Sequence, residues 1–237
     1  LVHLERRPID IALAREQHRA YEAALREAGW EVRTLPADPS LPDSVFVEDT
    51  AVVFDEVAVI ARPGAESRVP ETEPVARALA AHRPLVRITA PATLDGGDVL
   101  LIGRTVYVGE GGRTNRAGID QLAAAVAPHG YDVRPVAVRG CLHLKSAATL
   151  VAPDTVLCNP RWVDPAAFAG LRVLDVAAGE PGAANGLLVG ARVIYPSNFP
   201  VTARRLAERG IALLSLNVSE LQKAEGAVTC CSLVFTA

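Results

Sequence analysis

Short apolar stretches recur along the chain in pairs, and each pair is divided by two polar or turn-forming residues. Paired apolar runs separated in this way are typical of β-hairpins. The pattern therefore predicts four hairpins, and their turns are expected at 55–56, 103–104 and 153–154 in the first three. The four stretches are "TAVVFDEVAVIARPG", "DVLLIGRTVYVGEGG", "SAATLVAPDTVLCN" and "GLLVGARVIYP".

Two other segments carry apolar residues at helical spacing. In "IDIALAREQHRAYEAALREAGW", Asp10 is expected to cap the start of a helix and Gly29 to end it. In "NRAGIDQLAAAVAPHGYDVRPVAV", the apolar residues share one helical face and then alternate as in a strand. The stretch "DPAAFAG" is too short to predict a helix. The apolar positions of the second helix are Ile119, Leu122 and Val126, and those of the strand are Val133, Val136 and Val138.

The elements repeat as strand, strand, helix, strand. One residue marks the entry to the first strand of each repeat, with separations of 49, 45, 42 and 45 residues between successive markers. A period near 45 residues is typical of a closed radial array. If each first strand points to a common axis, these entry points converge in space. The markers are Asp49, Asp98, His143, Asn185 and Cys230.

The last dozen residues, "GAVTCCSLVFTA", place two cysteines at the start of an apolar stretch that we expect to form a strand. On a strand, Cys230 and Cys231 would point to opposite faces. Adjacent cysteines rarely bond to each other, because the geometry is strained. The stretch has no later partner in the chain, so we expect it to complete the first repeat and close the ring.

Composition narrows the class of protein. The 237 residues, half of them hydrophobic and 22% charged, predict one ordinary globular domain over 1–237. A net charge of −3 does not indicate a surface that binds nucleic acid, and no apolar run is long enough to cross a membrane. Four cysteines without framework spacing predict a reducing compartment, and the absence of a targeting signal predicts a cytoplasmic location. Without CxxC or HExxH, no metal site is expected. The start "LVHLERRPID" lacks methionine, so we expect residues upstream of Leu1.

The converging markers could perform nucleophilic catalysis. A thiolate attacks, an imidazole donates and then accepts a proton, and a carboxylate orients the imidazole. The motifs "TLDGGDVLL", "GCLHLKSA" and "VTCCSL" offer Asp95 or Asp98, His143, and Cys230 or Cys231. Each motif alone has an ordinary structural explanation, as a turn, a buried histidine or a core cysteine. The shared period favours the joint, catalytic interpretation.

A second cluster indicates the charge of the ligand. Asp43, Glu48 and Asp49 lie within seven residues in "LPDSVFVEDTAVV", and they repel one another unless a cation lies between them. A solvated acidic turn is the alternative. A guanidinium matches carboxylates well through its fork of donors. Arg68 and Arg113, in expected loops, could bind a carboxylate at the other end of the ligand. The cysteine would then attack the central guanidinium carbon, an amine would leave, and water would release a urea.

Five motifs in order resemble the dimethylarginine dimethylaminohydrolases of the guanidine-modifying (pentein) superfamily. They cover the chain from about residue 10 to its end. The resemblance implies a five-bladed α/β propeller and hydrolysis of Nω,Nω-dimethyl-L-arginine and Nω-monomethyl-L-arginine to L-citrulline and the corresponding amine. It implies no cofactor and a small-molecule partner. The motifs are "LPDSVFVEDTAVV", "ARPGAESR", "LDGGDVLLIGRTVYVGEGGRTNRAG", "LHLKS" and "EGAVTCCS".

The resemblance also implies a role for each matched residue. Cys230, rather than Cys231, is the nucleophile, His143 is the acid-base residue, and Asp95, rather than Asp98, orients it. Glu225 stands where many relatives have Asp, and its longer side chain could reshape the pocket for the methyl groups. A lid residue would lie upstream of this chain. The implied guanidinium-binding acids are Asp43, Glu48 and Asp49, and the implied carboxylate-binding residues are Arg68 and Arg113.

Several alternatives stay open. An arginine deiminase, amidinotransferase or other guanidine hydrolase would use the same triad, although arginine deiminases usually carry a helical insertion that this chain lacks. A non-catalytic binding module of the same fold is a second alternative, which the complete Cys-His-Asp set disfavours. A third is metal binding by Cys230, Cys231 and His143, although a closed structural zinc site needs four ligands. Whether the chain forms a homo-oligomer is left open.

Overall fold

The computed structural model describes residue 5 and residues 7–236, and their contacts divide them into two compact units. Unit 1 comprises the chain up to Thr34 together with Gly140–Thr229, and unit 2 comprises Leu35–Arg139 together with the chain from Cys230 onward. Each unit contains two small three-stranded sheets. Among the described residues, no helix combines the length and the apolar character needed to cross a membrane.

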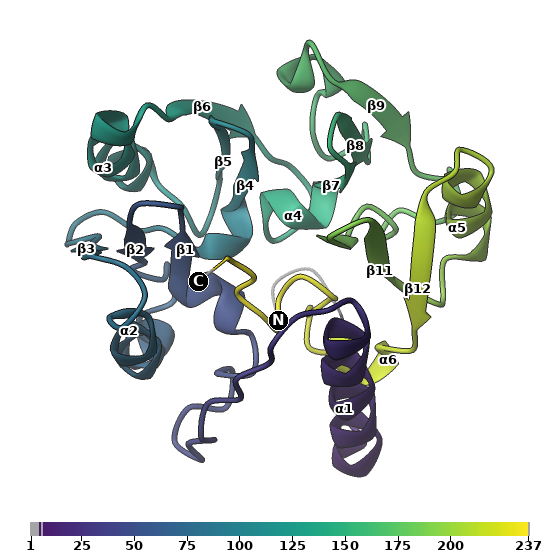
Figure 1. The fold of residues 1–237 in the computed structure, drawn as a ribbon, viewed down its shortest axis with the longest axis horizontal. Helices are drawn as coiled ribbons and strands as arrows, with labels where there is room; N and C mark the ends of the chain where they lie inside the picture. The colour runs from purple at the N-terminus through teal and green to yellow at the C-terminus, as the bar shows by residue number, and fades with distance from the viewer. Residues whose placement is uncertain (1–4, 6, 237) are drawn as a thin grey trace. The chain divides into compact units, whose positions relative to one another are not determined.

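The two sheets of unit 2 are built in the same way (Figure 1). An antiparallel hairpin comes first, a helix follows, and a third strand then pairs parallel to the second strand of the hairpin. In Figure 1, α3 lies beside the strands that it connects. The elements are β1 (Ala51–Val53), β2 (Ala58–Ile60), α2 (Thr72–Leu79) and β3 (Leu85–Arg87), then β4 (Val99–Ile102), β5 (Thr105–Glu110), α3 (Arg116–Val126) and β6 (Asp132–Ala137).

Unit 1 repeats this order twice, preceded by a long helix, α1 (Ile11–Glu27). In its first repeat the connecting helix is replaced by one 3-10 turn, η5 (Pro165–Phe168), which lies in the stretch too short to predict a helix. The other elements are α4 (Leu144–Ala147), β7 (Ala148–Ala152), β8 (Thr155–Cys158), β9 (Arg172–Asp175), β10 (Leu187–Val189), β11 (Arg192–Pro196), α5 (Pro200–Ala207), β12 (Ala212–Leu216) and α6 (Ser219–Gln222).

The middle strand of each sheet forms the core of its repeat. All residues of β2 and β8 are buried, as are the central residues of β5 and β11. Strands covered on both faces read as continuous apolar runs, which explains the stretches seen in the sequence. Each fully buried Val, Leu or Ile side chain contributes roughly 1.5–3 kcal/mol to folding. The hairpins therefore hold together through their second strands.

The expected helix ends are confirmed. The Asp10 side chain accepts hydrogen bonds from the N–H groups of Ala12 and Leu13, at 3.0 and 3.1 Å, and so caps α1. Beyond the other end, Gly29 has a φ of +91°, a conformation that favours glycine. The four hairpins are also confirmed, each at its predicted position.

The expected C-terminal strand is wrong, because residues 230–236 form no regular element. Leu233 and Phe235 nevertheless pack against the apolar cluster of β1, β2 and α2, within unit 2. The Arg83 guanidinium donates to the carbonyl of Thr236 and so binds the segment through a side chain. The apolar residues are therefore buried without a strand ladder, and the argument that two cysteines alternate on a strand no longer holds.

Candidate active site

Two acids in unit 2 are buried on a single turn, η1 (Val47–Thr50), just before β1. Glu48 and Asp49 are 5% and 4% exposed. The Asp49 Oδ1 atom accepts the N–H of Gly97 at 3.0 Å. The Thr50 hydroxyl donates to the carbonyl of Val47 at 2.7 Å and closes the turn. Two of the three acids that cluster in the sequence are therefore buried. Asp43 differs, because its side chain is exposed.

Arg68 is buried and contacts this turn. Its Nη1 donates to Asp49 Oδ2 at 2.5 Å, and its Nη2 donates to the carbonyls of Phe46 at 2.9 Å and Asp43 at 3.3 Å. Burial lowers the pKa of the Arg68 guanidinium, but the charges of Asp49 and Glu71 outweigh burial and raise that pKa above its ordinary value. Arg68 therefore stays charged and fixes the acidic turn.

Glu71, which the sequence interpretation missed, completes this buried ion-pair cluster. It is 2% exposed, and its Oε2 accepts both the Nε and the Nη2 of Arg68, at 3.0 and 2.8 Å. Burial raises the pKa of the Glu71 carboxyl, although Arg68 opposes this. Glu71 lies three residues after Arg68 at the end of the 3-10 helix η2 (Glu66–Glu71). This spacing of three residues between an arginine and a glutamate was the signal in the sequence that could have identified Glu71 as a partner of Arg68.

The two acids of "LDGGD" have different partners. Asp95 is fully buried and its Oδ1 accepts the N–H of Gly64 at 2.7 Å, while Arg113 lies 3.9 Å from its Oδ2. Asp98 Oδ2 accepts the hydroxyl of Thr114 at 2.7 Å, and that same hydroxyl oxygen accepts the N–H of Asp95 at 3.1 Å. Asp98 therefore supports the backbone at Asp95 through Thr114.

The glycine after Asp95 is required by close packing of two backbones. A Cβ atom added at Gly96 would lie 2.0 Å from the carbonyl oxygen of Glu48. Cβ atoms do not approach backbone oxygen this closely, so any side chain here would displace η1 or the segment that holds Asp95. The motif with glycines therefore sets the distance between the two acidic segments.

The segment with the two cysteines is joined to the acidic turn inside unit 2. The N–H of Glu48 donates to the carbonyl of Cys230 at 3.0 Å. Burial raises the pKa of the neighbouring Cys231 thiol to about 12, with a further contribution from the Glu48 charge. A thiol with so high a pKa is protonated at neutral pH and reacts slowly. Burial likewise raises the pKa of Cys158, in β8, to about 12.

His143 and Glu225 belong to unit 1. His143 is 5% exposed and immediately precedes α4, where its carbonyl accepts the N–H of Ser146 at 3.0 Å. Glu225 follows α6 with a φ of +62°, the one positive φ among the described non-glycine residues. The N–H of Gly226 donates to the carbonyl of Leu221 at 3.0 Å and closes this helix end. Glycine is the usual residue in such a conformation.

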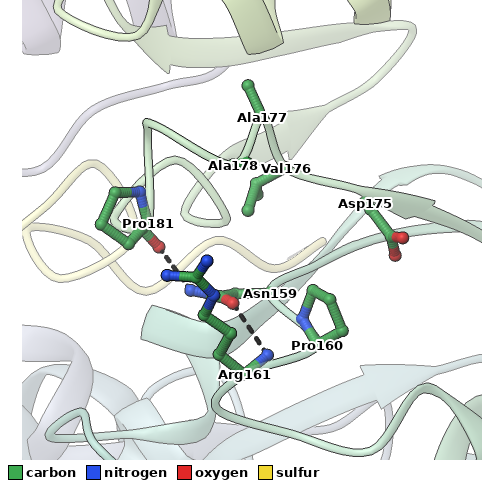
Figure 2. Close-up of a pocket in the computed structure, with 8 residues that line it drawn as sticks. All are labelled: Asn159, Pro160, Arg161, Asp175, Val176, Ala177, Ala178 and Pro181. Carbon is green, nitrogen blue, oxygen red and sulfur yellow. Dashed lines mark hydrogen bonds between the residues drawn. The ribbon is translucent and has the colours of Figure 1, made fainter.

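A surface pocket of about 190 Å³ lies elsewhere in unit 1 (Figure 2). Asn159 forms part of its wall, and its Nδ2 donates to the carbonyl of Pro181 at 2.8 Å. Figure 2 shows the Arg161 side chain beside Asn159 and Pro160. None of the residues selected from the sequence lines this pocket. The catalytic and binding residues selected from the sequence thus lie in unit 2, except His143 and Glu225, which lie in unit 1.

Comparison with known proteins places the chain in a class. The profile of the family described as arginine deiminase matches residues 36–177, more than half of the chain. The structure also superposes on the N-terminal domain of ArgZ, a cyanobacterial arginine dihydrolase, with a TM-score of 0.86 over 95% of this chain and 87% of that one. At 20% identity this similarity shows the fold alone. The class is an α/β protein with the arginine deiminase type of fold.

Two curated relatives narrow this class. An N(G),N(G)-dimethylarginine dimethylaminohydrolase of Streptomyces coelicolor is 48% identical over 98% of this chain and 90% of its own length. The protein of that name from Pseudomonas aeruginosa is 36% identical over 95% and 90%. A Pseudomonas aeruginosa dimethylarginine dimethylaminohydrolase, solved as a cysteine-to-serine mutant complexed with citrulline, superposes with a TM-score of 0.92 at 34% identity, over 99% of this chain and 93% of that one. The chain belongs to the dimethylarginine dimethylaminohydrolase family.

Proposed function

We propose that this protein hydrolyses Nω,Nω-dimethyl-L-arginine, and Nω-monomethyl-L-arginine, to L-citrulline and dimethylamine or methylamine. The hydrogen bond from the backbone N–H of Glu48 to the Cys230 carbonyl carries the proposal, because it joins the turn that bears two buried acids to the backbone of the candidate nucleophile. Carboxylates match the fork of donors of a guanidinium, and a guanidinium is the cation that a cysteine can attack at carbon. The full-length similarity to two proteins of this name supports the same reaction.

The proposed reaction uses three catalytic residues and no cofactor. The Cys230 thiolate forms a bond to the guanidinium carbon, and the tetrahedral adduct collapses as the C–N bond to dimethylamine breaks. His143 donates the proton that the leaving amine needs, and a covalent thiouronium remains. His143 then removes a proton from water, which attacks the same carbon, and the C–S bond breaks to release citrulline and the thiolate. Asp95 orients the imidazole and stabilises its protonated form.

The proposed binding residues divide between the two ends of the substrate. Glu48 and Asp49 hold the guanidinium, with Asp43 adding negative charge nearby. Arg113 binds the α-carboxylate, aided by the second N–H of Nη1 of Arg68. The other donors of Arg68 bind Glu71, Asp49 and the carbonyl of Phe46. Glu225 is the remaining proposed binding residue, and the length of its side chain sets the space for the methyl groups.

For the fold, we propose a single five-bladed α/β propeller over residues 1–237. The period near 45 residues and the four sheets of identical strand order support this arrangement. The C-terminal segment supplies Leu233 and Phe235 to the cluster of β1, β2 and α2, as a chain that closes a ring would do.

The decisive assay compares substrates. Citrulline release is expected from dimethylarginine. The kcat/KM for arginine is expected to be at least about 100-fold lower than that for dimethylarginine, because the site must accommodate methyl groups that arginine lacks. Colorimetric citrulline detection with both substrates side by side measures the ratio. Turnover of arginine in preference to dimethylarginine would identify a deiminase of the same mechanism. No citrulline from either substrate would favour the non-catalytic binding module.

Glu225 offers a test that separates function from stability. Replacing it with glycine removes an unfavourable positive φ, so the free energy of unfolding is expected to rise by up to about 1 kcal/mol. At the same time kcat/KM for dimethylarginine should fall at least about tenfold, since a proposed binding carboxylate is lost. Urea denaturation and the citrulline assay measure the two effects.

The control for this variant is Glu225→Gln, which keeps the backbone conformation and the side-chain length. It should lose activity without any gain in stability. If Glu225→Gly kept full activity, the side chain would have no role in binding, and its positive φ would need another explanation.

A further inference from the structure

We infer that Asn185 is a positioning residue that joins the segment after His143 to Thr229, the residue that precedes Cys230. Asn185 is 4% exposed and lies just before β10, inside unit 1. Its Nδ2 donates to the carbonyl of Lys145 at 3.0 Å and to the hydroxyl of Thr229 at 2.9 Å. Its Oδ1 accepts the N–H of Thr229 at 3.2 Å. One side chain thus connects two segments that are 84 residues apart in the chain.

The two connected segments carry proposed catalytic residues. Lys145 lies in α4, two residues after His143, and Thr229 is bonded directly to Cys230. On the other side of the cysteine, the carbonyl of Cys230 accepts the N–H of Glu48. The residue before the nucleophile is therefore held by Asn185 within unit 1, and the carbonyl of the nucleophile is held by the acidic turn within unit 2. This inference rests on the proposed function, because it takes its meaning from the roles of Cys230 and His143.

An amide is the group that this position requires. Its nitrogen supplies two donors and its oxygen one acceptor, and all three are used. An aspartate of the same size would bring a carboxylate oxygen to the carbonyl of Lys145, and the two acceptors would repel each other. A leucine would leave that carbonyl and the Thr229 N–H without these bonds. The side chain therefore specifies a distance between two backbones as well as filling space.

The location of Asn185 in the repeat strengthens the inference. Asn185 occupies the marker position before the first strand of its repeat, where other repeats have Asp49, Asp98 and His143. Asp49 and Asp98 also bind groups outside their own strands, namely Gly97 and Thr114. In the repeat of β10–β12, the marker thus supplies an amide that binds the two neighbouring segments.

The expected consequence is a loss in kcat with little change in KM. Asn185 touches neither end of the proposed substrate, so binding is preserved when it is replaced. A displacement of a catalytic group by about 1 Å costs on the order of 10²-fold in rate. We therefore expect Asn185→Ala to lower kcat for dimethylarginine about 100-fold, and KM to stay within about threefold.

The matched control is Asn159→Ala. Asn159 is 2% exposed, belongs to the same unit, and binds the carbonyl of Pro181 and the N–H of Arg161, at 2.8 and 3.0 Å. Its loss also removes buried hydrogen bonds, so the two variants should lose similar unfolding free energy. Only Asn185→Ala should lose kcat. Equal kcat losses in both variants would overturn the inference and leave Asn185 a structural residue.

A second variant tests the inference from the other partner. Thr229→Val keeps the shape and the N–H of residue 229 but removes the hydroxyl that Asn185 binds. We expect a kcat loss of about tenfold, and no further loss when it is combined with Asn185→Ala, since both changes break the same link. Independent, multiplying losses would contradict the inference. Absence of citrulline from the wild type would instead refute the proposed function, before any variant is compared.

Discussion

Replacing Cys230 by serine is expected to lower kcat for dimethylarginine by at least about 10⁴-fold while leaving the fold intact. A serine hydroxyl is far less ionised than a thiol at neutral pH and is a poor nucleophile without an activating base. The backbone carbonyl that binds Glu48 is retained, so the acidic turn should not move. Citrulline release over hours measures the residual rate, and circular dichroism confirms the fold.

The neighbouring cysteine provides the control. Cys231→Ser should keep kcat within about threefold, because burial and Glu48 hold the pKa of its thiol at about 12 and leave it protonated. Iodoacetamide should correspondingly inactivate the wild type through Cys230, as identified by mass spectrometry of the labelled peptide. Loss of activity in Cys231→Ser with activity retained in Cys230→Ser would reverse the assignment of the nucleophile.

The hairpins could be predicted because both of their determinants are local. Apolar runs define the strands, and residues such as Gly103, at a φ of +59°, define the turns. The C-terminal segment shows the limit of this reasoning. Its apolar residues correctly indicate burial, but a strand also needs a partner with free backbone groups. Leu233 and Phe235 reach the core from an irregular segment, and hydropathy alone does not distinguish the two cases.

The environment of each site residue depends on distant contacts and was harder to predict. The sequence predicts Arg68 to be a loop residue that could bind a carboxylate of the ligand, yet Asp49, 19 residues away in the chain, binds it in a buried pair. Glu71 was missed for the same reason, and Asn185 was one of the five markers but was given no role. Their roles come from hydrogen bonds to other segments, and neither residue belongs to a motif that names a chemistry.

The buried cluster around Arg68 also explains how unit 2 can favour a cation while it contains a buried cation of its own. Arg68 carries one positive charge, and the side chains that bind it, Asp49 and Glu71, carry two carboxylates. Glu48 lies on the same turn as Asp49, so three acidic side chains and one guanidinium lie in this part of unit 2. A guanidinium approaching η1 therefore meets a negative field, because the positive charge of Arg68 is more than compensated.

Gly96→Ala is expected to damage both stability and activity. The new methyl group would lie 2.0 Å from the carbonyl oxygen of Glu48, and backbone on both sides leaves no flexible side chain to move away. Relieving the overlap should lower the free energy of unfolding by about 3 kcal/mol. It should also lower kcat/KM about 100-fold, as Glu48 and Asp95 move apart. Urea denaturation midpoints and citrulline release measure the two losses.

Gly179→Ala is the matched control for this prediction. Gly179 is exposed, has no positive φ, and a Cβ there meets no atom within 4 Å, so both quantities should stay near wild type, within about 0.5 kcal/mol for stability. A Gly96→Ala protein as stable and as active as Gly179→Ala would show that the backbones of the two acidic segments do not approach this closely. The spacing between Glu48 and Asp95 would then have to be set by the hydrogen bonds of Asp49 and Thr114 alone.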